Sequence, residues 1–211
     1  NEIAVEQLRR LGDLYSRPLP RMVIDSIAEA NTCGLAWELT SGDAAPLYVL
    51  WDQGNNIIHL SCDRPTDGLI AEAAALFTDR VRDEALAGGL NFFRVSPGLP
   101  DLESALPSVL KGYDLKSEGR MFYALPVTSP LSESPPVPDG VAVVPITRSL
   151  LTDSSAGGIR LVKAGIDWMW PSFERFYQSG FGHVALLDNR VAGWCTSEFV
   201  SARACGLGIE I

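Results

Sequence analysis

A proline-rich segment near the middle of the chain most constrains its architecture. Residues 126–139, PVTSPLSESPPVPD, contain five prolines and no run with the period of a helix or a strand. Proline fixes φ and lacks a backbone N–H, so such a segment is semi-extended and does not enter a packed core. The sequence therefore predicts an N-terminal domain at residues 1–126, a linker at 127–138 and a second domain at 139–211.

The N-terminal domain begins with helical patterns and then changes to strand patterns. Residues 3–15 and 21–30 carry apolar side chains at helical spacing, and Pro18 and Pro20 lie between them. Short runs rich in aromatic and β-branched residues follow, joined by SGDAAP and QGNN, which are typical turn sequences. We expect three consecutive antiparallel strands at 33–39, 46–52 and 56–62.

The rest of this domain continues the mixture of helices and strands. Residues 65–89 are the clearest helix, with an apolar stripe, Thr66 as N-cap and two glycines at the end. The remaining expected elements are a strand at 90–97, a short helix at 100–110 interrupted by Pro107, and a strand at 113–126.

The second domain has a similar composition of elements. It begins with a strand pattern at 140–151, followed by a polar stretch at 152–158 and a helix at about 170–178 that starts at Pro171. Three antiparallel strands are predicted at 182–187, 190–200 and 204–211. The fold class expected for the whole chain is therefore α+β, with mostly antiparallel sheets flanked by helices.

Composition excludes several classes of protein. The net charge of −9 argues against a nucleic-acid binder, which needs a clustered basic face. The apolar runs are too short and broken for a membrane span, and the acidic amphipathic start does not resemble a signal peptide. The cysteines form no CxxC pair, and there are only two histidines. We therefore expect no metal site, reduced core thiols and a cytoplasmic location.

The final stretch carries a family resemblance. WPSFERFYQSGFGHVALLDNRVAGWCTSEFVSARACGLGIEI, residues 170–211, is similar to the two-domain GNAT acetyltransferases of bacteria, and YVLWDQGNNIIHLSCD at 48–63 is compatible with the same family. The resemblance implies an accessory N-terminal domain, followed by the first half of a GNAT-like domain. It also implies transfer of an acetyl group from acetyl-CoA to an amine, carried by a small molecule or a peptide.

The same resemblance predicts a truncated chain. In GNAT enzymes the strand that corresponds to 204–211 leads into a basic, glycine-rich loop at a helix N-terminus, which binds the coenzyme A pyrophosphate. No segment of this sequence has that composition at a strand-to-helix turn. We therefore expect the chain as given to be incomplete or inactive.

The resemblance also assigns roles to residues near the end of the chain. Glu210 corresponds to the glutamate that often accepts the proton of the amine, and Ile209 and Ile211 would offer backbone groups to the pantetheine arm of acetyl-CoA. The alternative for Glu210 is a surface glutamate whose two isoleucine neighbours point inward. The alternative for the isoleucines is packing in the core, which is compatible with the backbone role.

Alternation along 190–200 suggests a substrate-binding face. Trp194, Thr196 and Glu198 share one face, and Cys195, Ser197 and Phe199 share the other. Trp194 and Ser197 are the predicted substrate-binding residues, with core packing as the alternative for Trp194. A nucleophilic Cys195 is disfavoured, because no histidine is near it in the sequence. His183 is expected to be structural, and the aromatic stretch 167–171 to pack between domains or to bind the acceptor.

A different class of function stays open. The acidic charge and the missing loop also suit a non-catalytic binding or interaction module built on a GNAT-like scaffold. A third alternative is an α+β domain pair whose likeness to the family is superficial. An exposed edge strand at 204–211 could pair with its copy in a homodimer.

Overall fold

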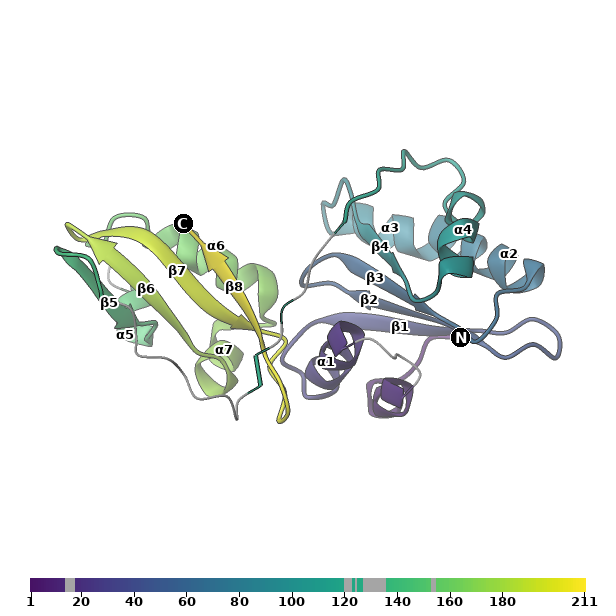
Figure 1. Cartoon of the computed structure of the whole chain (residues 1–211), viewed down its shortest axis with the longest axis horizontal. Coiled ribbons are helices and arrows are strands. Elements are labelled where there is room, and N and C mark those ends of the chain that lie inside the picture. The colour runs from purple at the N-terminus through teal and green to yellow at the C-terminus, as the bar shows by residue number, and fades with distance from the viewer. Residues whose placement is uncertain (14–17, 120–122, 124, 127–135, 153–154) are drawn as a thin grey trace.

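Two four-stranded sheets organise the chain in the computed structural model, which describes residues 1–13, 18–119, 123, 125–126, 136–152 and 155–211 (Figure 1). Their strand orders are β1-β2-β3-β4 and β5-β6-β7-β8. The expected α+β class is therefore confirmed. Most of the expected linker, 127–135, lies outside the described residues, so the boundaries at 126 and 139 stay predictions.

The first sheet is mostly antiparallel. The expected strands are present as β1 (Gly34–Leu39), β2 (Leu47–Asp52) and β3 (Ile57–Ser61), paired in consecutive antiparallel order. The fourth strand, β4 (Arg94–Pro97), runs parallel to β3. A parallel neighbour requires a crossover, and the long predicted helix provides it.

That crossover is helical throughout. It comprises α2 (Asp67–Leu76), one π-helical turn at Phe77–Val81 and α3 (Arg82–Ala87). Its N-cap is the predicted one, because Thr66 Oγ1 accepts a hydrogen bond from the Leu69 N–H at 3.3 Å. The π turn leaves the apolar stripe intact, since Leu69, Ala73 and Phe77 are all fully buried against the sheet.

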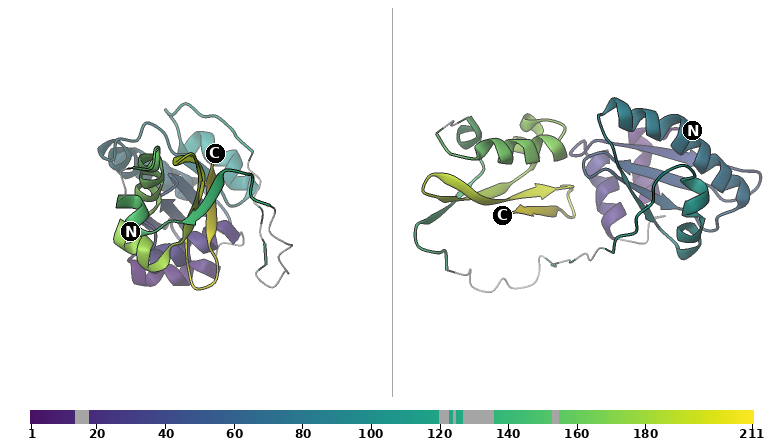
Figure 2. Two further views of the ribbon diagram at one scale, coloured as in Figure 1. Left: turned by 90° about the vertical axis from the view of Figure 1, so that its left-hand side faces the viewer. Right: turned by 90° about the horizontal axis from the view of Figure 1, so that it is seen from above.

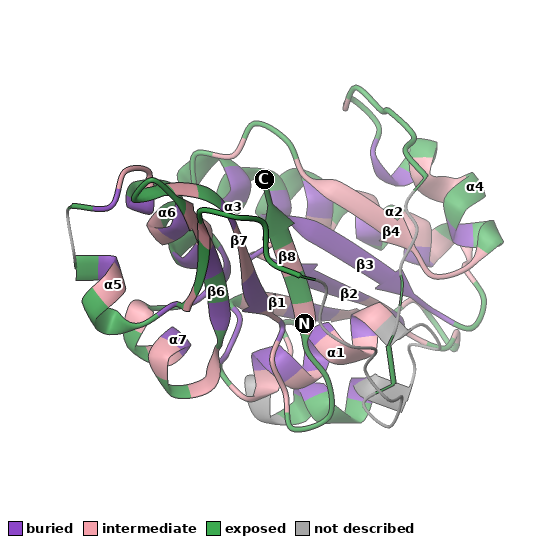
Figure 3. Ribbon diagram, turned by 60° about the vertical axis from the view of Figure 1, so that its left-hand side comes forward, coloured by how far each residue is buried: buried purple, intermediate pink, exposed green. Residues whose placement is uncertain are grey.

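Helices cover both faces of the first sheet. A 3₁₀ helix (Val5–Asp13) and α1 (Pro18–Ala28) lie on one face, and α2 with α4 (Pro100–Val109) lies on the other (Figure 1). Side chains alternate accordingly: Leu50 packs with α1, whereas Val49 and Trp51 pack with α2. Both faces being covered explains why β2 and β3 are almost entirely buried (Figure 3).

The second sheet follows the predicted order of strands. It contains β5 (Val141–Pro145), β6 (Gly182–Leu187), β7 (Arg190–Glu198) and β8 (Gly206–Glu210), all antiparallel. The helices are α5 (Arg148–Thr152), α6 (Ile159–Met169) and α7 (Phe173–Ser179). Ser172 rather than Pro171 caps α7, through a hydrogen bond from the Arg175 N–H to Ser172 Oγ at 3.1 Å.

Four expectations about elements need correction. Helix α6 was not predicted, although Ile159, Val162, Ile166 and Met169 give it a buried stripe at helical spacing. The strand expected at 140–151 ends at Pro145, because α5 begins at Arg148.

The other two corrections concern the end of the first unit. Helix α4 is not interrupted at Pro107: the proline lies in its last turn, so little of the helical hydrogen bonding is lost. No strand forms at 113–126 in the described residues of that range.

The two units pack against each other. One buried apolar cluster includes Ile24 and Leu50 of the first unit together with Ile166, Met169 and Phe176 of the second. The units lie side by side in Figure 1 and in the right-hand view of Figure 2. This shared cluster fixes the β2–β3 turn of the first unit beside α6 and β7 of the second.

Hydrogen bonds reinforce this contact between the units. Asn31 Nδ2 donates to the Val200 carbonyl at 2.8 Å, and the Arg175 guanidinium donates to the Glu29 carbonyl at 2.5 Å. The Ala202 N–H donates to Glu29 Oε1 at 3.3 Å. Within the described ranges, none of the helices combines the length and apolar character needed to cross a bilayer.

Candidate functional site

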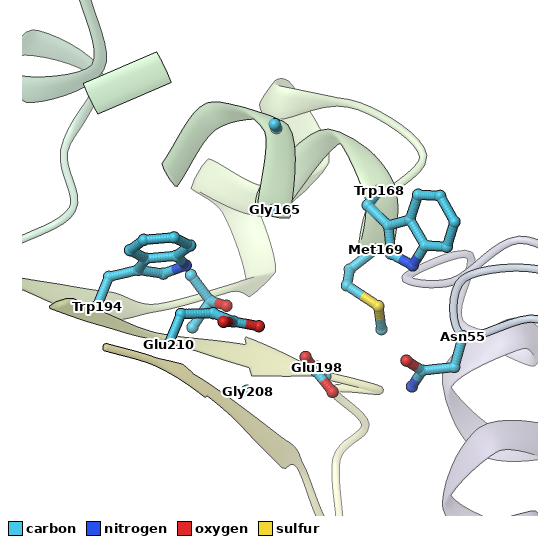
Figure 4. A pocket seen from close by; sticks show the side chains of 10 residues that line it. Asn55, Gly165, Trp168, Met169, Trp194, Glu198, Gly208 and Glu210 are labelled. Carbon is cyan, nitrogen blue, oxygen red and sulfur yellow. The ribbon is translucent and has the colours of Figure 1, made fainter. Parts of the chain in front are cut away.

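A pocket of about 350 Å³ opens beside the second sheet, where it meets the first unit (Figure 4). Helix α6 forms one wall, β7 and β8 form the floor, and the β2–β3 turn closes one end. The lining residues are Asn55, Ala164, Gly165, Trp168, Met169, Trp194, Thr196, Glu198, Gly208 and Glu210.

The strand pattern explains which side chains line the floor. Trp194, Thr196 and Glu198 alternate along β7 onto the pocket face. Antiparallel register places Glu210 of β8 opposite Trp194, and Gly208 opposite Thr196. Carboxyl groups from two neighbouring strands therefore point into the same space.

Two glycines make room for these side chains. A Cβ at Gly208 would collide with Glu198 Oε1, so any larger residue would displace that carboxylate. Because Gly165 has no side chain, α6 can pass close to Trp194. A Cβ at this position would lie 3.4 Å from the indole nitrogen.

Glu198 is the more buried of the two acids. Burial raises the pKa of its carboxyl above the usual value, and the nearby Glu210 carboxylate raises it further. A hydrogen bond from the Asn55 side chain stabilises the ionised form and opposes part of this increase. The site thus contains a carboxyl with increased basicity next to a second, more exposed one.

A fully buried carboxyl lies behind the pocket. Asp52 ends β2, and its Oδ1 accepts a hydrogen bond from the Asn55 N–H at 3.1 Å. Burial raises the pKa of Asp52 to about 7, the backbone N–H groups of Asn55 and Gly54 lower it, and the charge of Glu198 adds to the increase. Asp52 therefore interacts with both parts of the site: it accepts a hydrogen bond from the β2–β3 turn, and its pKa depends on the charge of Glu198.

The structure brings together some of the sequence-predicted residues. Glu210 and Trp194 both line the pocket, and Trp194 also packs against the buried cluster between the units. Ser197 lies elsewhere: it is fully buried on the opposite face of β7, where its Oγ accepts from the Phe181 N–H at 2.9 Å. Trp168, from the aromatic stretch at 167–171, is a lining residue.

Ile209 and Ile211 point away from the pocket. Both side chains are solvent-exposed, Ile209 to 66 %, so the alternative of core packing is wrong. Glu210 faces α6 and lines the pocket. The alternative of a surface glutamate between two inward isoleucines is therefore wrong. The alternation along β8 is the predicted one, and its direction is the one that the predicted role of Glu210 requires.

His183 and Cys195 meet across the strands. The β6–β7 register pairs them directly, on the face of the sheet away from the pocket. Burial raises the pKa of the Cys195 thiol, which disfavours the reactive thiolate. Among the residues described, no group of three or more histidine, cysteine or acidic side chains is arranged to hold a metal ion.

Sequence reasoning missed Glu198 and Asn55 as site residues. The alternation that grouped Glu198 with Trp194 was a sufficient signal for the first. No sequence signal points to Asn55, because it is 143 positions from Glu198 and joins the pocket only through packing of the two units.

Replacing Ser197 with alanine is expected to weaken the fold and leave ligand binding in the pocket unchanged. The Phe181 N–H would lose its acceptor, which costs about 1–3 kcal/mol for a buried donor. Urea unfolding of the wild type and of Ser197→Ala measures this cost. A large loss of binding at unchanged stability would instead support the predicted role of Ser197 in substrate binding.

Comparisons with known proteins show a likeness of fold. No protein-family model matches the chain, and no curated protein matches it significantly in sequence. Among solved structures it is similar to a GCN5-related N-acetyltransferase-like protein from Streptococcus suis 89/1591, with a TM-score of 0.53 and 15% identity over 97% of this chain and 75% of that one. The chain thus has a GNAT-like α+β fold.

A second solved structure is more distant. It is a tandem GNAT protein from the clavulanic acid biosynthesis pathway, with a TM-score of 0.44 and 13% identity over 93% of this chain and 72% of that one.

Proposed function

We propose that the chain is an N-acetyltransferase of the GNAT type, which transfers an acetyl group from acetyl-CoA to an amine held in the pocket. One observation carries the proposal: Glu198 and Glu210 project into a pocket that Trp168 and Trp194 wall on the α6 and β7 sides. Carboxylates attract an ammonium group, and tryptophan faces bind both cations and apolar bodies. The GNAT-like fold supports the reaction type.

The acidic pair suits the proton chemistry of this reaction. An amine reaches the pocket as an ammonium ion and must lose a proton before its nitrogen can attack. Glu198 has a pKa raised by burial, so its carboxylate is a better base than an exposed one. The amine nitrogen then forms a bond to the acetyl carbon, and the carbon–sulfur bond breaks. The nitrogen loses its extra proton to become an amide, and coenzyme A leaves as a thiolate that takes up that proton.

Glu210 fits the same chemistry in a second role. It lies next to Glu198 and is more exposed, so it can receive the proton directly or pass it to solvent. Its negative charge also keeps a proton on Glu198 at higher pH. We therefore propose the two acids as one proton-accepting pair.

Acetyl-CoA would supply the acetyl group and the leaving thiol. In the described part of the chain β8 is the edge of its sheet, and most of the strand is exposed (Figure 3). The side chains of Ile209 and Ile211 are exposed as well. An edge strand has backbone N–H and C=O groups free to bind an extended ligand. We propose that Ile209 and Ile211 bind the pantetheine arm through their backbone.

Two assays on the purified chain test this function. Calorimetric titration with acetyl-CoA measures donor binding, and release of free thiol reports acetyl transfer to a panel of primary amines and lysine peptides. Donor binding with amine-dependent thiol release is expected. Amine binding without either would overturn the proposal and favour the non-catalytic binding module.

A further inference from the structure

One lining residue of the pocket comes from the other sheet. Among the described residues that line it, Asn55 alone belongs to the first unit, on the turn between β2 and β3. Its side chain extends to the pocket end of β7 and lies beside Glu198 (Figure 4), where its hydrogen bonding lowers the pKa of the Glu198 carboxyl. A polar group of the first unit thus acts directly on a carboxyl of the second.

The turn that carries Asn55 is held firmly on the side of the first sheet. Asp52 Oδ1 accepts from the Asn55 N–H at 3.1 Å, and the Gln53 N–H donates to the Cys33 carbonyl at 3.1 Å. The Arg94 N–H donates to the Asn56 carbonyl at 2.8 Å, and Asn56 is buried with φ of +53°. These bonds fix the turn relative to the first sheet.

The turn is also packed against the second unit. A Cβ at Gly54 would lie 3.4 Å from Met169 Cε and 3.5 Å from the Met169 carbonyl oxygen, so the glycine lets the turn approach the end of α6. Met169 belongs to the apolar cluster that both units share. The position of Asn55 therefore depends on how the units dock.

We propose that Asn55 is a positioning residue of the pocket, whose side-chain amide orients the Glu198 carboxylate, so that the first unit completes the site of the second. This role rests on the proposed function in one respect, because it treats Glu198 as the group that accepts the amine proton. The accessory unit then has a defined task. It supplies a hydrogen bond to the Glu198 carboxylate, and without that bond the carboxylate can rotate.

The electrostatic surroundings of Glu198 make the effect of Asn55 measurable. Glu210 faces it from β8, and Asp52 at the end of β2 is close enough for the charge of Glu198 to raise its pKa. The lining residues of α6 are uncharged. Among these neighbours the Asn55 amide favours the ionised form, so its removal is expected to move the titration of Glu198 to higher pH.

The test compares the wild type with Asn55→Ala, Asn55→Asp and Gln53→Ala. The alanine removes the donor but keeps the Asn55 backbone bond to Asp52, and the aspartate keeps the size while adding a negative charge. Gln53 lies in the same turn outside the pocket, which makes it a matched control. Carboxyl ¹³C NMR of glutamate-labelled protein follows Glu198, whose signal is assigned by its loss in Glu198→Gln.

The titration midpoint of Glu198 should increase in Asn55→Ala, increase further in Asn55→Asp, and stay in place in Gln53→Ala. With phenethylamine as the probe, kcat/KM below that midpoint should fall about tenfold in Asn55→Ala, the typical value of one hydrogen bond to a charged group. The near-UV circular dichroism of the tryptophans checks that each variant is folded.

Either of two results would overturn the inference. One is a Glu198 midpoint that is the same in all folded variants. The other is a midpoint that moves while phenethylamine affinity, measured by calorimetry, and kcat/KM keep their wild-type pH profile. If the wild type itself transfers no acetyl group, the proposed function fails. The NMR titration and phenethylamine binding then still decide whether Asn55 controls the titration midpoint of Glu198.

Discussion

Replacing Glu198 with glutamine is expected to lower kcat for the proposed acetylation of a primary amine roughly 10²- to 10³-fold. Glutamine keeps the size and the hydrogen bond to Asn55 but cannot accept a proton, and general-base catalysis typically contributes a factor of about 10²–10⁴. The acid limb of the pH–rate profile should disappear with it, because that limb reports protonation of the base. Steady-state kinetics of the wild type and Glu198→Gln between about pH 5 and 9 measures both effects.

Glu210→Gln is the informative partner of this variant. Removing the neighbouring negative charge relieves the repulsion that helps to raise the pKa of Glu198, so the acid limb should move to lower pH. The loss in kcat should be smaller, about tenfold, and KM for a cationic amine should rise. Glu174→Gln serves as a control, since Glu174 is exposed on α7 and paired with Arg148.

The opposite ranking would reassign the roles. A Glu198→Gln enzyme with normal kcat beside an inactive Glu210→Gln enzyme would make Glu210 the base, as the family resemblance implies. If both single variants and the double variant lose the same amount, the two carboxyls act as one unit, because the effects of coupled groups do not add.

The contrast between β7 and α6 shows what the sequence can predict about this site. The alternation along β7 identified the set Trp194, Thr196 and Glu198, because period-2 patterns depend only on local geometry. Helix α6 has an equally regular apolar stripe, but it follows a polar segment containing two glycines, and that segment obscured its start. The sequence therefore does not predict the helical wall of the pocket, although it places Trp168 in an aromatic stretch.

Asn55 and the exposed isoleucines show where local patterns stop being sufficient. The direction in which Ile209 and Ile211 point depends on which side of β8 is covered by α6, and that is a property of packing between elements. Asn55 enters the pocket only because the two units share one apolar cluster. Side chains that meet through docking of separate sheets leave no period or spacing in the sequence.

The contributions of Asp52 and His59 to the stability of the wild type are expected to cancel between about pH 4 and 6.5, because the two buried groups act in opposite directions. Burial raises the pKa of Asp52 from 3.8 to about 7, so its contribution is fully present below 3.8 and is lost as the pH rises to about 7. Burial lowers the pKa of His59 from 6.5 to about 4, so its contribution is present above 6.5 and is lost as the pH falls to about 4.

The two contributions are similar in size. One pKa unit corresponds to about 1.4 kcal/mol, so the change across the full window is about 4 kcal/mol for Asp52 and about 3 kcal/mol for His59. Asp52 and His59 are both almost completely buried, so solvent screening reduces these values little. Within their common window, the folded state keeps a proton on Asp52 and excludes one from His59, so its net charge matches that of the unfolded chain in these two groups.

In Asp52→Asn the free energy of unfolding should therefore show the pH dependence that His59 contributes. Asparagine stays neutral and can still accept the hydrogen bond from the Asn55 N–H, so the free energy of unfolding should increase by about 3 kcal/mol from pH 4 to 6.5 instead of staying level. Above pH 7 the variant should exceed the wild type, which must ionise a buried carboxyl close to Glu198. Urea unfolding at half-unit pH steps tests this, with Asp43→Asn, an exposed aspartate of the β1–β2 turn, as the control. Parallel pH profiles for wild type and Asp52→Asn would show that Asp52 is already ionised in the folded protein, and the link from the buried turn to the pocket would then be one of fixed negative charge.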